Sequence, residues 1–354
     1  MSNEQFWNEI ASPWMREDGP DDDIVLSTRV RLARNFQDVP FPNRMSTADG
    51  EKILTRLISG YHDQGTSIGK FSLIKMADLA AGDRRVLLEK HLISPQLADG
   101  ESQSACLLSE QEEISVMVNE EDHLRIQCLY PGLQLTKALE TAIHMDSWLE
   151  GAMPYAFDSQ IGFLTSCPSN VGTGLRASVM MHLPGLAISR KLEQIIQSIS
   201  KMGLVVRGIY GEGSKSFANL YQVSNQITLG KSEHMIIEDL QNVVNQIVVY
   251  EREVRKSFLE AAQTQVEDQV FRALGVLRNA RLISSMEAGN TLSQVRVGID
   301  EGLISDIPTK LFNELIIAVQ PGCLEKLAGK ALTAEERDQM RASLLRENFM
   351  SYSG

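Results

Sequence analysis

The alternation of apolar and polar residues is clearest over residues 24–32. One face of this stretch carries Ile24, Leu26, Thr28, Val30 and Leu32, and the other carries Val25, Ser27, Arg29 and Arg31. Such alternation predicts a half-buried β-strand. Adjacent arginines repel each other unless an anion lies between them, and their planar donor groups match phosphate oxygens. An exposed strand edge with solubilising charges is the alternative, and this stretch alone does not decide between the two.

From residue 24 to about residue 229, short strand patterns alternate with helical ones. They predict helices over 46–60, 83–92 and 186–202, and strands over 161–166, 176–183 and 204–209. Two alternating runs, 114–119 and 124–129, enclose a polar turn and predict a hairpin, although the turn lacks glycine.

After about residue 232 the pattern changes to long amphipathic stretches, at 235–263, 266–279, 285–298, 308–320 and 333–348. The 3.6-residue period is clear in Leu240, Val243, Val244, Ile247 and Val248. We therefore expect an N-terminal segment 1–23, a mixed domain 24–254 and an all-helical domain 255–354. The alternative is that the helices extend a single domain.

Composition excludes several classes of protein. The chain has 354 residues, a formal net charge of −12 and a pI near 5.1, which argues against a nucleic-acid partner. No apolar run reaches membrane-spanning length and the N-terminus lacks a secretory signal, so we expect no membrane partner. The scattered cysteines, Cys106, Cys128, Cys167 and Cys323, predict neither a metal site nor disulfides and favour the cytoplasm.

Two Gly-rich loops carry candidate chemistry. The loop 166–178 follows an apolar strand and can present backbone N–H groups to an anion, but it matches neither a dinucleotide fingerprint nor a P-loop. Its Cys167 is either an inert buried thiol or, beside a cation, a reactive thiolate. In the second loop Glu212 lies between two glycines after Arg207, where it closes over a ligand or simply lies exposed at a surface turn.

Charged residues gather at the predicted turn 120–123. Glu120 and Glu121 precede Arg125, which fits an ion-pair network, favoured by the residues alone, or a general base with its neighbour. Five arginines lie at or beside strand ends and Gly-rich loops: Arg29, Arg31, Arg125, Arg176 and Arg207. That is more guanidinium than one core holds unpaired. A triphosphate would pair with them, which indicates phosphoryl transfer by positioning and charge neutralisation.

Four segments, 27–31, 119–125, 167–178 and 207–212, resemble in sequence and order the motifs of the phosphagen (guanidino) kinases over about residues 24–255. Only about 20 residues precede the first motif and a helical region of about 100 follows. In both respects the chain resembles the bacterial branch of this family, whose members modify arginine side chains in proteins. The resemblance implies an α+β fold, with a mainly antiparallel sheet flanked by helices and an all-helical C-terminal domain.

The resemblance also implies roles for residues. Ser27, Arg29, Arg31, Arg125, Arg176 and Arg207 match phosphate-binding positions, and Thr28, Val30, Ala177, Ser178, Val179, Met180, Gly208, Ile209, Tyr210, Gly211 and Glu212 belong to the stretches that line ATP. His91 looks like the histidine near adenine. Glu121 and Glu212 match the carboxylates that hold the substrate guanidinium, with Glu121 as base, and Cys167 matches the active-site cysteine. A guanidinium has a pKa above about 12, so its proton must leave as the N–P bond forms.

A second candidate site lies near the C-terminus. Thr333-Ala334-Glu335-Glu336 predicts a capping box that opens a helix. Arg337 and Arg341 follow one turn apart, and this spacing alone favours a solvated charged face. The segment nevertheless resembles a motif of the arginine-modifying branch, which implies that Arg337, Asp338, Arg341 and Ala342 form an allosteric phosphoarginine site.

We therefore expect an ATP-dependent kinase, with Mg²⁺, that acts on exposed arginines of protein substrates. The resemblance implies a cytoplasmic homodimer that marks proteins for a Clp protease and is assisted by a zinc-binding activator protein. The alternative is a metabolic kinase for free arginine, against which the missing N-terminal helical domain argues. A second alternative is an inactive adaptor that only binds phosphoarginine, which the intact motifs disfavour.

Overall fold

The arginine-bearing segment forms the first strand of one antiparallel sheet. The computed structural model describes residue 6 and residues 9–64, 69–100, 103–151, 153–189, 191–209 and 216–352. Within them eight strands form one sheet in the order β2-β3-β4-β5-β1-β8-β10-β9, with every neighbouring pair antiparallel. The strands are β1 (Val25–Arg34), β2 (Phe71–Lys75), β3 (Ala105–Ser109), β4 (Ile114–Val118), β5 (Leu124–Pro131), β8 (Leu175–His182), β9 (Leu204–Gly208) and β10 (Leu220–Asn225).

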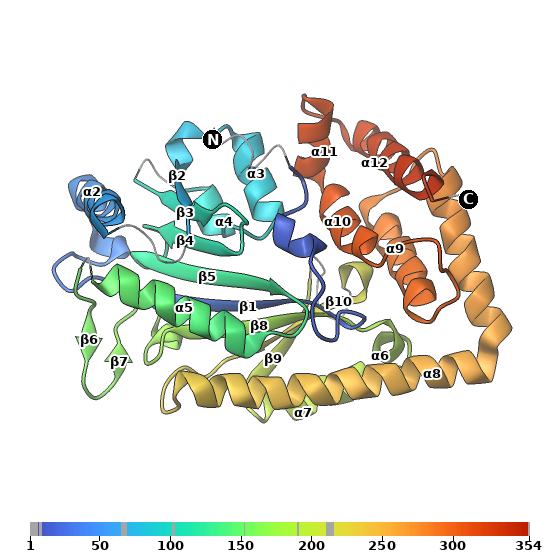
Figure 1. Ribbon diagram of the computed structural model, residues 1–354, viewed down its shortest axis with the longest axis horizontal. Helices are drawn as coiled ribbons and strands as arrows, with labels where there is room; N and C mark the ends of the chain where they lie inside the picture. Colours follow the sequence, from blue (N-terminus) through green and yellow to red (C-terminus); the bar gives the residue numbers. More distant parts are fainter. Residues whose placement is uncertain are drawn as a thin grey trace.

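Helices cover the sheet and form the C-terminal part (Figure 1). They are α2 (Thr47–Gln64), α3 (Ala81–Glu89), α4 (Pro95–Ala98), α5 (Leu135–Glu150), α6 (Pro184–Ile188), α7 (Leu192–Ser200), α8 (Glu233–Asn279), α9 (Ser285–Asp300), α10 (Lys310–Ala318), α11 (Pro321–Ala328) and α12 (Ala334–Met350). A short 3₁₀ turn, η1 (Pro13–Arg16), precedes β1, and a small ribbon of β6 (Phe157–Asp158) and β7 (Gly162–Phe163) follows α5.

Two apolar cores hold these layers together. On one face of the sheet, Val30 of β1 packs in a core shared with Leu139 of α5 and Leu240 of α8. The second core joins Leu129 of β5 to α3, to η1 and to Phe312 of α10. The C-terminal helices therefore pack against the sheet, beside the face that carries the arginines.

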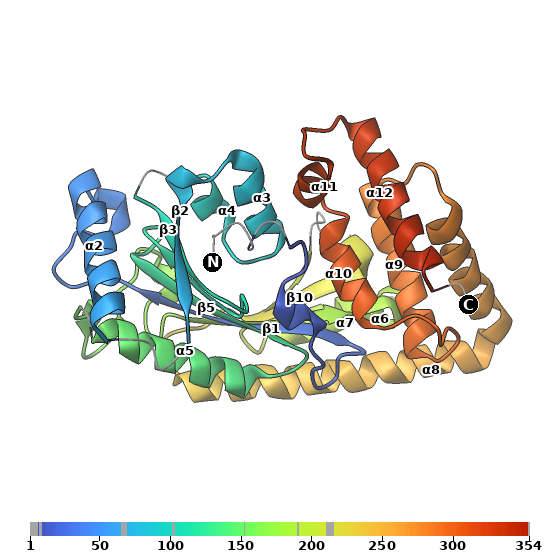
Figure 2. The ribbon, with the colours of Figure 1, turned by 45° about the horizontal axis from the view of Figure 1, so that its top comes forward.

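The long helix α8 connects the two parts. It runs below the sheet and turns near its middle toward α9–α12, which stand beside its second half (Figures 1 and 2). The turn falls at Ala262, whose φ of −147° and ψ of 43° are not helical. The predicted stretches 235–263 and 266–279 are thus two arms of one bent helix, and the domain boundary predicted at residue 254 lies inside it.

The predicted fold class is confirmed, but some element predictions are wrong. Residues 161–166 form only the two-residue strand β7, and the helix predicted over 186–202 is divided into α6 and α7. The hairpin is confirmed without glycine, because Asn119 takes the positive φ of 56° that the turn requires. The predictions omitted α5, α11, β2, β3 and β10.

Candidate active site

Strand register places the predicted arginines on one face of the sheet. Arg31 of β1 lies opposite Arg176 of β8, and Ala33 of β1 lies opposite Arg125 of β5. Arg207 of β9 lies opposite Gln222 of β10, which in turn lies opposite Met180 of β8. Directly opposed residues of antiparallel strands share a face, as do residues two apart along a strand. Arg29, Arg31, Arg125, Arg176 and Arg207 therefore point to the same side.

Neutral acceptors hold two of these arginines in place. Arg29 donates to Ser178 Oγ at 3.3 Å and to Gln222 Oε1 at 2.8 Å. Arg176 donates to Asn170 Oδ1 at 3.1 Å, to the Asn225 carbonyl at 3.0 Å and to Ser169 Oγ at 3.0 Å. These bonds fix the direction of each guanidinium, and the neutral acceptors themselves add no negative charge.

Arg31, opposite Arg176, is partly buried. Its Nε is enclosed and has no hydrogen-bond partner among the described residues. Burial first, and then the charges of Arg29 and Arg125, lower the pKa of Arg31 well below its usual value. Burial and nearby Arg207 also lower the pKa of Arg176. The neighbouring guanidinium groups thus add to the effect of burial in both shifts, and an anion bound between them would oppose their repulsion.

The turn between β4 and β5 places two carboxylates beside Arg125. Arg125 donates to Glu120 Oε1 and to Glu121 Oε2, both at 2.8 Å. The Glu120 side chain is 1% exposed and burial raises its pKa, whereas the Glu121 side chain is 33% exposed. Glu121 is therefore the more accessible of the two to a second molecule.

Asp122 fixes this turn against the first Gly-rich loop. Its Oδ1 accepts from Asn35 Nδ2 and from the Ser166 N–H, both at 2.6 Å. The loop passes close to β1 at Gly174, where φ is +66° and a Cβ atom would lie 2.6 Å from the Ala33 carbonyl oxygen. Only glycine fits this backbone and this approach. The two loops that carry Glu121 and Cys167 are thereby held together.

The predicted groups line two adjoining hollows. One, of about 240 Å³, is bounded by Glu121, Cys167 and three arginines, Arg31, Arg125 and Arg176. Cys167 is partly exposed, with its Sγ 3.0 Å from Ser169 Oγ. The other, of about 550 Å³, shares Arg31 and Arg125 and adds Arg29, His91 and, from the C-terminal part, Gln320 and Pro321. The arginines thus join a pocket with the catalytic candidates to a larger one.

The larger hollow contains residues that the sequence reasoning missed. Arg85, Ser94, Gln320 and Pro321 line it, although none belongs to a phosphagen-kinase motif. Arg85 lies in the predicted helix 83–92, but no sequence signal connected that helix with residues 320–321. A still larger groove, of about 1020 Å³ between α7 and α8, is lined by none of the predicted site residues that the structure describes.

Several predicted nucleotide-binding residues direct their side chains elsewhere. Val30, Ala177 and Val179 lie in the core under α5 and α8, and Thr28 donates to the Gly132 carbonyl at 2.7 Å. Ser27, Ser178, Met180 and Ile209 line small hollows beside His91. Gly208 ends β9, and Tyr210, Gly211 and Glu212 lie outside the described residues. The predicted role of Glu212 as a second substrate carboxylate stays a prediction.

The C-terminal motif opens α12 as the capping box predicts. Arg337 donates to Glu325 Oε1 of α11 at 3.1 Å and its side chain is 29% exposed. Arg341 is 2% exposed and donates to the Val319 and Ile283 carbonyls at 3.0 and 2.9 Å. Arg341 is therefore not part of a solvated charged face, and of the two arginines Arg337 is the more accessible.

The family of the catalytic part follows from comparison with known proteins. The family described as "ATP:guanido phosphotransferase, C-terminal catalytic domain" matches residues 52–254. With the arginine-lined face and the adjacent carboxylates, this match defines an ATP:guanido phosphotransferase, an enzyme whose phosphate donor is ATP and whose acceptor is a guanidinium group.

The C-terminal part of the chain narrows the class of phosphotransferase further. Residues 263–354 match the family described as "Protein-arginine kinase McsB C-terminal domain". The chain is 53% identical over 348 residues to the protein-arginine kinase of Geobacillus sp. (strain WCH70), covering 98% of this chain and 96% of the relative. It is equally similar to that of Bacillus cereus (strain B4264), covering 98% of both. The chain belongs to the protein-arginine kinases, and its acceptor is arginine.

Solved structures agree on the fold. The duplicated taurocyamine kinase of Schistosoma mansoni has a TM-score of 0.60 and 23% identity, covering 74% of this chain and 39% of that one. A lombricine kinase has a TM-score of 0.59 and 22% identity, covering 70% and 69%. This likeness places the chain in the phosphagen-kinase fold, as its sequence motifs predict.

Proposed function

We propose that this chain transfers the γ-phosphoryl group of ATP to arginine side chains of proteins. The observation that carries the proposal is the single sheet face on which five arginines converge beside the accessible carboxylate of Glu121. The names and the near full-length match of the relatives support protein arginine, rather than free arginine, as the acceptor.

The arginines and Glu121 would divide the chemical work. The arginines neutralise and orient the triphosphate, so that the γ-phosphorus faces the incoming nitrogen. A guanidinium nitrogen of the substrate forms the N–P bond, the bond from phosphorus to the ADP oxygen breaks, and the nitrogen's proton passes to Glu121. Glu121 is held in position by Arg125, and its carboxylate also accepts hydrogen bonds from the substrate guanidinium.

Magnesium fits this site as a companion of the nucleotide. Among the described residues no group of three or more His, Cys, Asp or Glu side chains could hold a metal ion. Mg²⁺ is commonly bound by substrate phosphates, waters and one or two carboxylates, so a dedicated cage is not required. When bound, it would neutralise phosphate charge. Glu121 lines the smaller hollow and its side chain is 33% exposed, so it is the carboxylate that could reach such an ion.

The biological setting is proposed from the resemblance. It comprises a cytoplasmic homodimer, a zinc-binding activator, delivery of marked proteins to a Clp protease and an allosteric phosphoarginine site at Arg337. The accessibility of Arg337 supports the last of these. No helix in the described part of the chain is both long and apolar enough to cross a membrane.

The proposal is tested by identifying the molecule that accepts the phosphoryl group. The chain is incubated with Mg²⁺ and γ-labelled ATP, and with either free arginine or a denatured, arginine-containing model protein. We expect label on protein arginine, detected by mass spectrometry under non-acidic conditions, because the N–P bond is acid-labile. Label on free arginine alone would instead identify a metabolic kinase, and label on neither would reject both functions.

A further inference from the structure

Two buried polar atoms beside the arginine face have no hydrogen-bond partner among the residues that the structure describes. Trp14 of η1 is 7% exposed, and its indole Nε1 makes no hydrogen bond. Asn313 of α10 likewise has an enclosed Oδ1 without a partner. Buried polar atoms are nearly always paired in folded proteins, so each such exception requires an explanation. These two atoms differ in kind: the indole N–H can only donate and the amide oxygen can only accept.

Both side chains line the same narrow hollow. It has a volume of about 30 Å³ and is also bounded by Ser27, His91, Met180 and Ile209. Trp14, Ser27, His91 and Met180 also line the next hollow, of about 20 Å³, which includes Arg29. Arg29 in turn lines the large hollow of the arginine face. The hollow lined by Trp14 and Asn313 is therefore adjacent, through shared lining residues, to the hollow that contains Arg29.

The surroundings define the chemistry of a ligand that would satisfy both atoms. Met180, Ile209 and Leu220 form apolar walls that suit the face of a ring, whereas Ser27, Lys90 and His91 add polar groups to the lining. The ligand must offer a hydrogen-bond acceptor to Trp14 and a donor to Asn313. The Watson–Crick edge of adenine has both on neighbouring atoms, the acceptor N1 and the 6-amino group. The hollow is smaller than a purine ring, so η1 and α10 must move apart from the sheet when a base enters.

We propose that Trp14 and Asn313 recognise the adenine edge of ATP, with the Trp14 N–H donating to N1 and the Asn313 oxygen accepting from the 6-amino group. The inference rests on the proposed use of ATP at the arginine face. Neither residue lies in the segment that matches the catalytic family, residues 52–254. The N-terminal turn and the C-terminal helices thereby complete the base site of the catalytic domain, and nucleotide binding is coupled to the position of α10.

Base analogues test each contact separately. Binding to the full chain is titrated with ATP, with purine riboside triphosphate, which lacks the 6-amino group, and with 1-deaza-ATP, which lacks N1. For the wild type we expect each analogue to bind about tenfold more weakly than ATP, the typical effect of leaving one buried polar partner unsatisfied. Asn313→Ala should bind ATP and purine riboside triphosphate equally well but still discriminate against 1-deaza-ATP. Trp14→Phe should bind ATP and 1-deaza-ATP equally well but still discriminate against purine riboside triphosphate.

The pattern across ligands separates recognition from a structural role. If either substitution only damaged the structure, it would weaken the binding of ATP and of both analogues by the same factor. That result would overturn the proposal. Equal affinity of the wild type for all three nucleotides would overturn it too, even if a variant failed to fold. Asn242→Ala, on the exposed surface of α8, is the matched control and should preserve all wild-type ratios. Phosphoryl transfer to protein arginine is measured independently. Failure of the proposed function can therefore be distinguished from failure of adenine recognition by Trp14 and Asn313.

Discussion

Arg31 and Arg176 lie directly opposite each other in the register of β1 and β8. Like charges in such a pair destabilise a sheet by up to about 1 kcal/mol, unless an anion lies between them. The sheet tolerates the pair because the second core and the α5–α8 core stabilise the same strands. A polyphosphate bound between the two guanidinium groups, as proposed above, would remove this repulsion.

The first prediction concerns this repulsion. Arg31→Met, which keeps the volume and removes the charge, should raise the free energy of unfolding without nucleotide by about 0.5–1 kcal/mol. It should also remove most of the stabilisation by ATP, which for the wild type reaches about 2.7 kcal/mol at a hundredfold excess over Kd. Urea unfolding with and without ATP measures both effects. The exposed Arg44→Met is the control, and equal ATP stabilisation of Arg31→Met would contradict the assignment.

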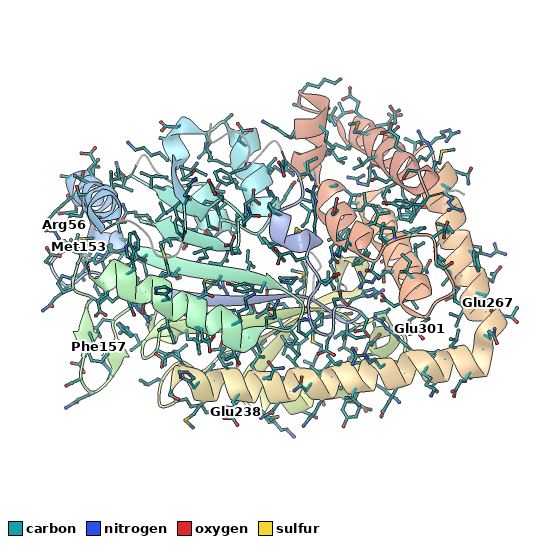
Figure 3. The ribbon with its side chains drawn as sticks, viewed as in Figure 1. Arg56, Met153, Phe157, Glu238, Glu267 and Glu301 are labelled. Atoms are coloured by element: carbon teal, nitrogen blue, oxygen red, sulfur yellow. The ribbon has the colours of Figure 1, made fainter. Side chains whose placement is uncertain are left out.

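The second prediction concerns the base. Glu121→Gln should keep the fold and ATP affinity but lower kcat for protein arginine about 10²- to 10⁴-fold, because the amide cannot take the proton. Single-turnover kinetics with labelled ATP measures the step. Glu238→Gln is the control, since Glu238 lies on α8, which covers the other face of the sheet (Figure 3). Wild-type turnover by Glu121→Gln would show that another group accepts the proton.

The third prediction separates the two C-terminal arginines. Removing both is expected to preserve basal activity and abolish the response to phosphoarginine. Arg341 is buried and donates hydrogen bonds to two backbone carbonyls. Arg341→Ala should therefore also destabilise the C-terminal helices, by about 1–3 kcal/mol. Arg337→Ala alone is therefore the cleaner variant. Its activity, followed against phosphoarginine concentration, should stay at the basal level; a wild-type dose-response would exclude Arg337 from the site.

The fourth prediction concerns the contact between the two parts of the chain. Glu89 of α3 accepts from the backbone N–H groups of Gly322 and Cys323 at the start of α11, both at 2.8 Å. Glu89→Ala leaves both groups unpaired and should cost about 1–3 kcal/mol of stability. Hydrogen exchange should rise in α11 and not in β1. The exposed Glu347→Ala is the control, and unchanged exchange in α11 would mean that other contacts dock this helix.

The fifth prediction is a pH dependence. Burial, with a smaller effect of Arg29, lowers the pKa of His91 to about 4 from its usual 6.5. Between these values the unfolded chain binds a proton that the folded chain does not, so stability falls as the pH falls from about 6.5 to 4, by at most about 3 kcal/mol. His91→Asn suits the positive φ of 60° and should flatten this slope in urea unfolding. The exposed His234→Asn should not, and equal slopes in all three proteins would refute the assignment.

Local patterns predicted the elements whose signals are complete within a few residues. The alternation around Arg29 and Arg31 predicted β1, and the capping box predicted the start of α12. Short runs of mixed composition were misread: residues 161–166 have a strand's composition, but only Gly162–Phe163 find a partner strand. A strand exists only where a neighbour completes its hydrogen bonds, and that neighbour is remote in the sequence.

The order of motifs, the arginines in an acidic chain and the paired glutamates are all visible in the amino-acid sequence, and they indicate the chemistry of this protein. Which of these side chains share a face depends on the folded sheet, since register places Arg31 against Arg176 and turns Val30 into the core. It also brought Trp14, Asn313 and Gln320 to the nucleotide face from opposite ends of the chain. Periodicity is encoded by near neighbours, whereas docking of distant segments depends on packing that no local pattern specifies.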